Sequence, residues 1–245
     1  IQAYTANKAK KVMLLGLLTM GSFTLNSCDE LQQVMGNTTQ GGSGFNVASG
    51  LKQALEMGVS SGVDLLSKDG GYFKDQAVRI LLPEELQKVD KTLRSVGLGS
   101  LADQGLKVLN EAAENAVSQA KPIFLSAIRN MTFTDAMNIL KGNNTAATTY
   151  LKNSTYSSLE TAFAPKVQAS LSEVGADKVW ENIINKYNQI PLVKPVEPNL
   201  TKYVTQQAIN GLFVKVGDKE KEIRTNIAAR TTPLLKSVFA MQDNR

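Results

Sequence analysis

The chain has 245 residues, 42% of them hydrophobic and 20% charged, and carries 27 lysines and arginines against 22 aspartates and glutamates. It contains no histidine and a single cysteine, Cys28. Without histidine there is no Ser-His-Asp triad and no imidazole ligand for zinc. Any metal site must therefore use oxygen ligands, which favour calcium or magnesium.

The first 28 residues have the pattern of an export signal. Lys8, Lys10 and Lys11 form a basic flank, and Val12 to Phe23 form an apolar run that is too short for a membrane-spanning helix of about 20 residues. Leu25-Asn26-Ser27-Cys28 then resembles a lipobox, in which the cysteine receives diacylglycerol before cleavage. We predict a lipoprotein signal peptide over 1–27 and lipidation of Cys28. The alternative is a buried helix with an ordinary core thiol.

Most of the net positive charge of the chain lies in this signal. Its only charged residues are three lysines, so the net charge of +5 falls to +2 in the mature chain, with 24 basic against 22 acidic side chains. Such a balance lacks the basic surface that dominates nucleic-acid affinity, and we expect no nucleic-acid partner. Because Cys28 is assigned to lipid, no intramolecular disulfide is expected, and the fold must rest on its core.

Residues 28–45 are expected to be the lipidated cysteine and a flexible tether, because 36–44 are rich in glycine, threonine and asparagine. From Asn46 onward, apolar residues recur at helical spacing. The pattern predicts helices over 46–66, 84–96, 101–131, 132–141, 145–151, 154–174, 176–187 and 200–216, and a terminal helix after Thr232-Pro233. Val78 to Leu82 is the one β-branched run, and a single strand makes no sheet.

The longest predicted helix, 101–131, is rich in alanine and is expected to be central. Pro122 must kink or split it, because proline has no N–H to bond the carbonyl of Ser118. The predicted fold class is all-α: a single multi-helix domain over 46–240, built around a long alanine-rich central helix broken near Pro122.

Several segments resemble a known family. In chain order they are Leu82-Pro83-Glu84-Glu85-Leu86, Asn110-Glu111-Ala112-Ala113-Glu114, Pro122-Ile123-Phe124, Met131-Thr132-Phe133-Thr134-Asp135-Ala136, Ala146-Ala147-Thr148-Thr149-Tyr150, Tyr203-Val204-Thr205, Gly211-Leu212-Phe213, Ile223-Arg224 and Ala229-Arg230-Thr231-Thr232. Together they resemble the bacterial domain of unknown function 4197, over roughly Val47 to Phe239. The resemblance implies an α-helical envelope protein, often lipidated, and no established reaction.

Four oxygen-bearing side chains form a candidate metal site. Asn110 and Glu114 lie one turn apart on a face of the central helix that we expect to be its polar side. With Asp135 and Glu220 they could bind calcium or magnesium, and no other cofactor is expected. The alternative is helix electrostatics: Asp135 has the spacing of a capping box, and Glu220 has an arginine at i,i+4.

Two further features bear on binding. Arg224 and Arg230 are expected in a polar loop before a helix N-terminus, where guanidinium groups suit an anionic ligand; surface salt bridges are the alternative. Aromatic residues recur through the middle helices, at Tyr150, Tyr156, Phe163, Trp180 and Tyr187. Their helical spacing indicates core or groove lining, with an exposed peptide-binding groove as the functional alternative.

We therefore expect a lipid-anchored protein of the cell envelope, in the outer membrane facing the periplasm. The favoured function is a non-enzymatic interaction or assembly module with an envelope protein as partner, because no nucleophile and base are grouped in the sequence. The alternative is a small-ligand or Ca/Mg-binding protein, or an enzyme of oxygen chemistry, that uses the carboxylate cluster.

Overall fold

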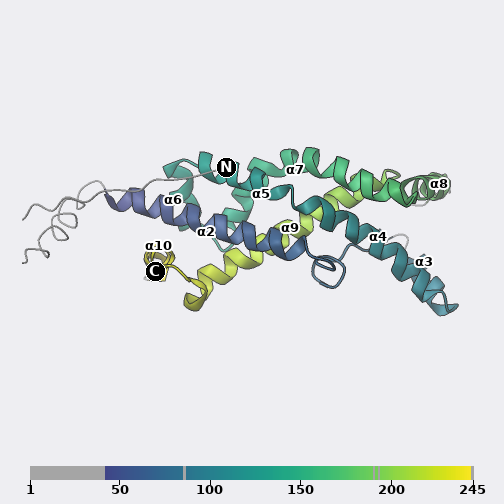
Figure 1. The fold of residues 1–245 in the computed structure, drawn as a ribbon, viewed down its shortest axis with the longest axis horizontal. Coiled ribbons are helices and arrows are strands. Elements are labelled where there is room, and N and C mark those ends of the chain that lie inside the picture. The colour runs from purple at the N-terminus through teal and green to yellow at the C-terminus, as the bar shows by residue number, and fades with distance from the viewer. Residues whose placement is uncertain (1–41, 85–86, 190, 193, 244–245) are drawn as a thin grey trace, which may run out of the picture. The chain divides into compact units, whose positions relative to one another are not determined.

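A computed structural model describes residues 42–84, 87–189, 191–192 and 194–243 (Figure 1). The described residues form helices and connecting turns, without a strand, so the all-α prediction is confirmed. The helices are α2 (Gly42–Leu66), α3 (Gln87–Ser95), α4 (Gly99–Val117), α5 (Ala120–Asn130), α6 (Phe133–Lys141), α7 (Ala146–Glu173), α8 (Ala176–Asn188), α9 (Leu200–Thr225), the short 3-10 helix η2 (Ile227–Ala229) and α10 (Pro233–Asp243).

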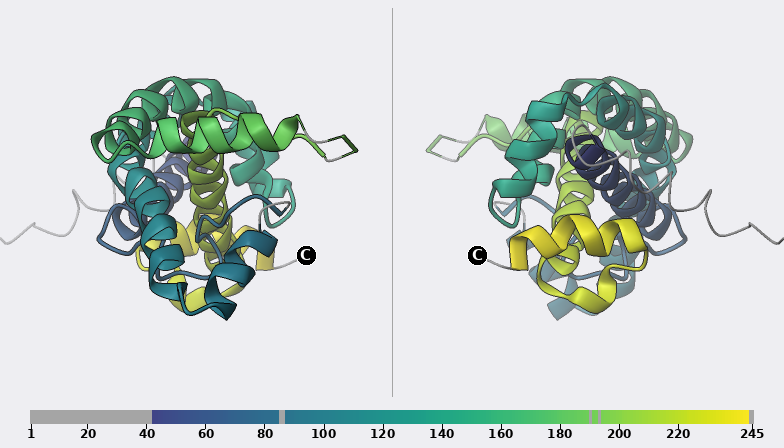
Figure 2. Two further views of the ribbon diagram at one scale, coloured as in Figure 1. Left: turned by 90° about the vertical axis from the view of Figure 1, so that its right-hand side faces the viewer. Right: turned by 90° about the vertical axis from the view of Figure 1, so that its left-hand side faces the viewer.

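Three long helices form the centre of this helical unit. α4, α7 and α9 each pack against the other two, and α2 and α5 pack beside them. In the end-on views, α8 lies across one end of the unit and α10 across the other (Figure 2). α7 and α9 run antiparallel, because Thr201 near the start of α9 bonds Gln168 late in α7, whereas Glu220 late in α9 bonds Ala147 at the start of α7.

The core follows from the alanine stripe of α4. Ala112, Ala113 and Ala116 have no exposed surface, and their small side chains allow neighbouring helices to approach closely. Phe124 of α5 meets Phe213 of α9 edge to face, with ring centroids 5.7 Å apart.

The predicted 101–131 helix divides into two. α4 ends at Val117 and α5 starts at Ala120, which places Pro122 in the first turn of α5, where a missing N–H costs no helical bond. The break predicted near Pro122 is confirmed, and it lies on the N-terminal side of the proline because the carbonyl of Ser118 is the one that loses its partner.

Other helix boundaries were predicted wrongly. The two helices predicted over 145–151 and 154–174 are one, α7, and Ser154 donates to the carbonyl of Tyr150 within it at 2.8 Å. α9 continues to Thr225, nine residues beyond the predicted end, because its last turns carry the buried side chains of Glu220, Ile223 and Arg224. The run 78–82 pairs with no strand among the described residues.

The predicted signal peptide, Cys28 and most of the tether lie outside the described residues. α2 begins at Gly42, so residues 42–45 of the expected tether are helical. Among the described residues, no helix has the length and apolarity needed to cross a membrane.

Candidate functional site

Glu114 holds the loop that follows α2. Its carboxylate accepts three backbone N–H groups: Gly70 at 3.1 Å on Oε2, and Tyr72 at 3.0 Å and Phe73 at 3.2 Å on Oε1. Gly70 has a φ of +79°, a left-handed conformation that favours glycine and turns these N–H groups toward one point. Glu114 is therefore an acceptor for the loop backbone, and only 6% of it is exposed.

Asn110 holds the next part of the same connection. Its Oδ1 accepts the N–H of Ile80 at 2.8 Å, and its Nδ2 donates to the carbonyls of Ile80 at 2.9 Å and Leu106 at 2.7 Å. The amide thus satisfies both backbone groups of Ile80, as a neighbouring strand would. The buried backbone of Ile80 is therefore satisfied without a neighbouring strand.

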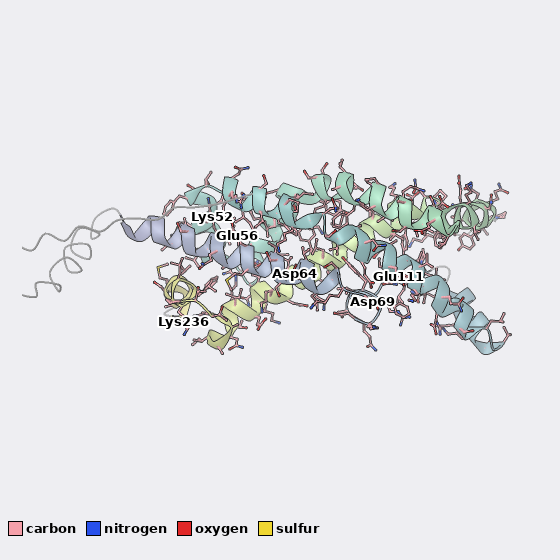
Figure 3. The ribbon with its side chains drawn as sticks, viewed as in Figure 1. Lys52, Glu56, Asp64, Asp69, Glu111 and Lys236 are labelled. Atoms are coloured by element: carbon pink, nitrogen blue, oxygen red, sulfur yellow. The ribbon has the colours of Figure 1, made fainter. Side chains whose placement is uncertain are left out.

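The expectation that Asn110 and Glu114 lie on the polar side of the central helix is wrong. Both are buried beneath the 67–82 loop, because its backbone N–H groups need acceptors once the loop covers α4. Glu111, by contrast, lies at the surface of α4 (Figure 3), where its carboxylate is 3.2 Å from the ammonium of Lys107.

Tyr72 attaches the 67–82 loop to α9. Its hydroxyl donates to the carbonyl of Ala208 at 2.7 Å, and its ring lies against Gly211, where an added Cβ would come within 2.8 Å of the ring. Burial first, and then the negative charge of Glu114, raise the pKa of Tyr72 far above its usual range, so the hydroxyl remains a hydrogen-bond donor.

Asp135 caps α6. Its N–H donates to Oγ1 of Thr132 at 3.1 Å, and its Oδ2 accepts the N–H of Thr132 at 3.0 Å, which confirms the predicted capping box. Two hydrogen bonds lower the pKa of Asp135 below its usual value: first the one from the Thr132 hydroxyl, and then the one from the Thr132 backbone N–H.

Glu220 and Arg224 form a buried pair that joins two helix ends. Glu220 accepts the N–H groups of Ala147 at 2.9 Å and Thr148 at 2.8 Å, which are free donors in the first turn of α7. Arg224 donates to Glu220 at 2.9 Å and to the carbonyl of Ile139 at 2.8 Å, in the last turn of α6. The predicted i,i+4 pair is confirmed, and it also fixes α6 to α7.

Arg230 caps the C-terminal end of α9. It donates to the carbonyls of Ile223 and Arg224, both at 3.0 Å, and is only 2% exposed. The guanidinium groups of Arg224 and Arg230 lie 5.8 and 5.6 Å from the ring of Phe239 in α10. The expectation of a polar loop that presents both arginines to a ligand is wrong, because both are bound to helix C-terminal carbonyls inside the protein.

The four candidate metal ligands are not brought together. Asn110 and Glu114 bond the 67–82 loop, Asp135 bonds its own N-cap, and Glu220 bonds α7 and Arg224. Within the part of the chain that the structure describes, no three histidine, cysteine, aspartate or glutamate residues are grouped to hold a metal ion. The geometry favours helix capping and loop attachment for these side chains.

An apolar groove lies between α4 and α8, and we call it the α4–α8 groove. Its volume is about 520 Å³. It is lined by Leu82, Gln104, Gly105, Val108, Leu109, Val174, Ala176, Val179, Trp180 and Leu200. Val174 and Val179 are each 60% exposed, so apolar side chains face solvent on one wall of the groove. The size and lining match those of sites that receive an apolar ligand or partner.

Trp180 forms a rigid part of this groove. Its ring stacks on that of Tyr203 with centroids 6.0 Å apart, and its Nε1 donates to the carbonyl of Glu197 at 3.1 Å. The Tyr203 hydroxyl donates to the carbonyl of Leu81 at 2.7 Å. Groove lining was one predicted role of the aromatic residues, whereas Phe163 is core. Val174 and Val179 were not predicted as groove residues, although both are apolar residues on either side of Gly175 in the sequence.

The structure therefore defines a helical-bundle protein whose buried polar side chains attach loops and helix ends to one another. The chain belongs to the family described as Protein of unknown function (DUF4197), whose model matches residues 42–240. The match confirms the family resemblance seen in the sequence. Comparisons with curated proteins and with solved structures gave no match.

Proposed function

We propose that this protein is a lipid-anchored component of the cell envelope, acting without catalysis as an interaction module whose partner is an envelope protein. The observation that carries the proposal is the α4–α8 groove, which is apolar, open to solvent and supported by the bonded ring of Trp180. Exposed apolar surface of this kind is typical of interaction sites. The buried carboxylates support the absence of catalysis, because internal bonds occupy them.

The anchor in this proposal is Cys28, with residues 1–27 removed as a signal peptide. Several acyl chains, at about 0.8 kcal/mol per buried methylene, make membrane attachment lasting. Mass spectrometry of the mature protein should find an acylated Cys28 as its first residue, and membrane fractionation should find it in the outer membrane. Cys28→Ser should accumulate as uncleaved precursor. Mature protein that begins at another residue would contradict the anchor.

The groove is tested separately in living cells. A photo-crosslinking amino acid at Val179 should give one defined adduct with an envelope protein, whereas the same group at Lys236 on α10 should not. The purified partner should then change the fluorescence of Trp180, the only tryptophan in the chain, and Val179→Asp should weaken binding at least tenfold. Equal adducts at Val179 and Lys236 would contradict a role for the groove while leaving the anchor unaffected.

A further inference from the structure

Three polar hollows of similar size lie elsewhere on the helical unit. One, of about 420 Å³ between α5 and α7, is lined by serine, threonine, asparagine and apolar residues and has no aromatic ring. Another, of about 380 Å³ beside α8, has its polar groups bonded to one another: Gln168 accepts from Thr201 at 2.5 Å and donates to Asp177 at 2.8 Å. Neither offers both a ring and unbonded polar groups.

The third hollow, which we call the α6–α7 hollow, differs in both respects. It has a volume of about 410 Å³ and is lined by Asp135, Asn138, Asn143, Tyr150 and Asn153 among others. The side-chain amides of Asn138 and Asn153 have no hydrogen-bond partner among the described residues, and Asn143 uses only its Oδ1, toward Thr145. Three amides are thus available beside a half-buried tyrosine ring.

Buried hydrogen bonds hold the two helices that form the walls of this hollow. The buried Glu220–Arg224 pair binds the last carbonyls of α6 and the first N–H groups of α7, the two elements between which the hollow lies. At the turn between them, an added Cβ on Gly142 would lie 2.6 Å from the Cβ of Ala146 and 3.0 Å from the carbonyl of Asn138, so glycine permits the close approach. A site with such walls loses little entropy when a ligand binds.

The chemistry of the lining selects a neutral polyhydroxylated ligand. Each carboxamide both donates and accepts, as sugar hydroxyl and acetamido groups do, and an aromatic ring offers a flat apolar face for the C–H side of a pyranose. No lysine or arginine is among the lining residues, which disfavours phosphate or another anion. Asp135 and Tyr150 line the same hollow, and burial, followed by the charge of Asp135, raises the pKa of Tyr150.

We propose that the α6–α7 hollow binds a neutral saccharide, with the ring of Tyr150 under the sugar and the amides of Asn138, Asn143 and Asn153 on its hydroxyl or acetamido groups. This site is separate from the α4–α8 groove and does not depend on the function proposed for the groove.

The test is titration of the purified full chain with chitotetraose and maltotetraose, followed by calorimetry and saturation-transfer NMR. At least one of the two should bind saturably, with a dissociation constant on the order of 1 mM because the hollow is open. Tyr150→Ala should weaken binding roughly tenfold or more, and Asn138→Ala and Asn153→Ala should each weaken it several-fold, by loss of one hydrogen bond.

The matched control is Asn185→Ala, which removes an exposed asparagine from the lining of the polar hollow beside α8. It should bind like the natural chain. If Tyr150→Ala does not fold, the exposed Asn138 and Asn153 variants keep the test decisive. Absence of saturable binding of both saccharides at millimolar concentration, or equal affinity in the Asn138, Asn153 and Asn185 variants, would overturn the proposal.

Discussion

Two buried glutamates, Glu114 and Glu220, are stabilised as charged groups by different sets of partners. Glu114 and Glu220 each accept backbone N–H groups from a segment far away in the sequence, and each is less than 9% exposed. Glu220 has Arg224 as a cationic partner, whereas no described lysine or arginine lies within ion-pair distance of Glu114. A buried carboxylate therefore needs no counter-ion when enough N–H donors converge on it, as they do where Gly70 turns the loop.

The difference concerns what each glutamate holds. Glu220 and Arg224 join the ends of two helices: the carboxylate accepts N–H groups in the first turn of α7, and the guanidinium donates to carbonyls in the last turn of α6. Glu114 receives N–H groups alone, from a loop whose carbonyls face elsewhere. The predictions below test this division, from the largest expected effect to the smallest.

Removing the cation from the Glu220 side should have the largest effect. Arg224→Ala leaves a buried carboxylate without its counter-ion and removes the guanidinium hydrogen bond to the carbonyl of Ile139, and should lower the free energy of unfolding by about 3 to 5 kcal/mol. Urea denaturation, monitored by circular dichroism, measures this loss in the free energy of unfolding. The double variant Glu220→Gln/Arg224→Met should lose less than the sum of its single variants, by about 0.5 to 3 kcal/mol. Additive losses would show that the two side chains act independently.

On the Glu114 side, Glu114→Gln keeps the shape and removes the charge. One amide oxygen remains, but the amide nitrogen now faces an N–H donor, so the loss should be about 1 to 3 kcal/mol. Hydrogen exchange should increase at Gly70, Tyr72 and Phe73 and leave α7 unchanged. The surface control Glu111→Gln should stay within about 0.5 kcal/mol of the natural chain. Uniform exchange across all helices would contradict a local role for Glu114.

Acid should weaken the same loop at a second point. The hydrogen bond from Lys215 is the main cause that lowers the pKa of Asp75 below its usual value, so the folded state binds this proton less readily than the unfolded chain does. The resulting stability is present above the unfolded pKa of about 3.9 and is lost as the pH falls through the lower folded value. Asp75→Asn and Lys215→Met should each flatten the dependence of the unfolding free energy on pH below about 5. An unchanged acid slope in both variants would show that the pair contributes nothing measurable.

Divalent ions should have the smallest effect. Because Glu114 and Glu220 are occupied by backbone donors, millimolar calcium, magnesium or EDTA should leave the melting temperature unchanged. A ligand that binds only the folded state would raise it by mass action. A calcium-dependent rise that disappears in Asp135→Asn would revive the metal site predicted from sequence.

Sequence spacing was sufficient to predict a side-chain contact wherever both partners lie within one helix turn. The capping box of Thr132 and Asp135 and the pair of Glu220 and Arg224 were visible because three- and four-residue spacings place side chains together in any helix. The same spacing placed Asn110 and Glu114 on one face of α4. It could not show that this face is covered, because the covering loop begins about 40 residues earlier in the chain and contacts α4 only through the tertiary packing.

The amino-acid sequence by itself determined an all-α domain of this family, the division of the central helix near Pro122 and the local caps, because helical periodicity, proline chemistry and short-range hydrogen bonds act within a few residues. Tertiary structure alone decided that Asn110, Glu114 and Glu220, expected at an open metal site, became buried internal attachments. It also decided where apolar and amide side chains stay exposed, in the α4–α8 groove and the α6–α7 hollow. The physical reason is that a buried polar group must take whichever backbone partner packing brings to it, and packing depends on the whole chain.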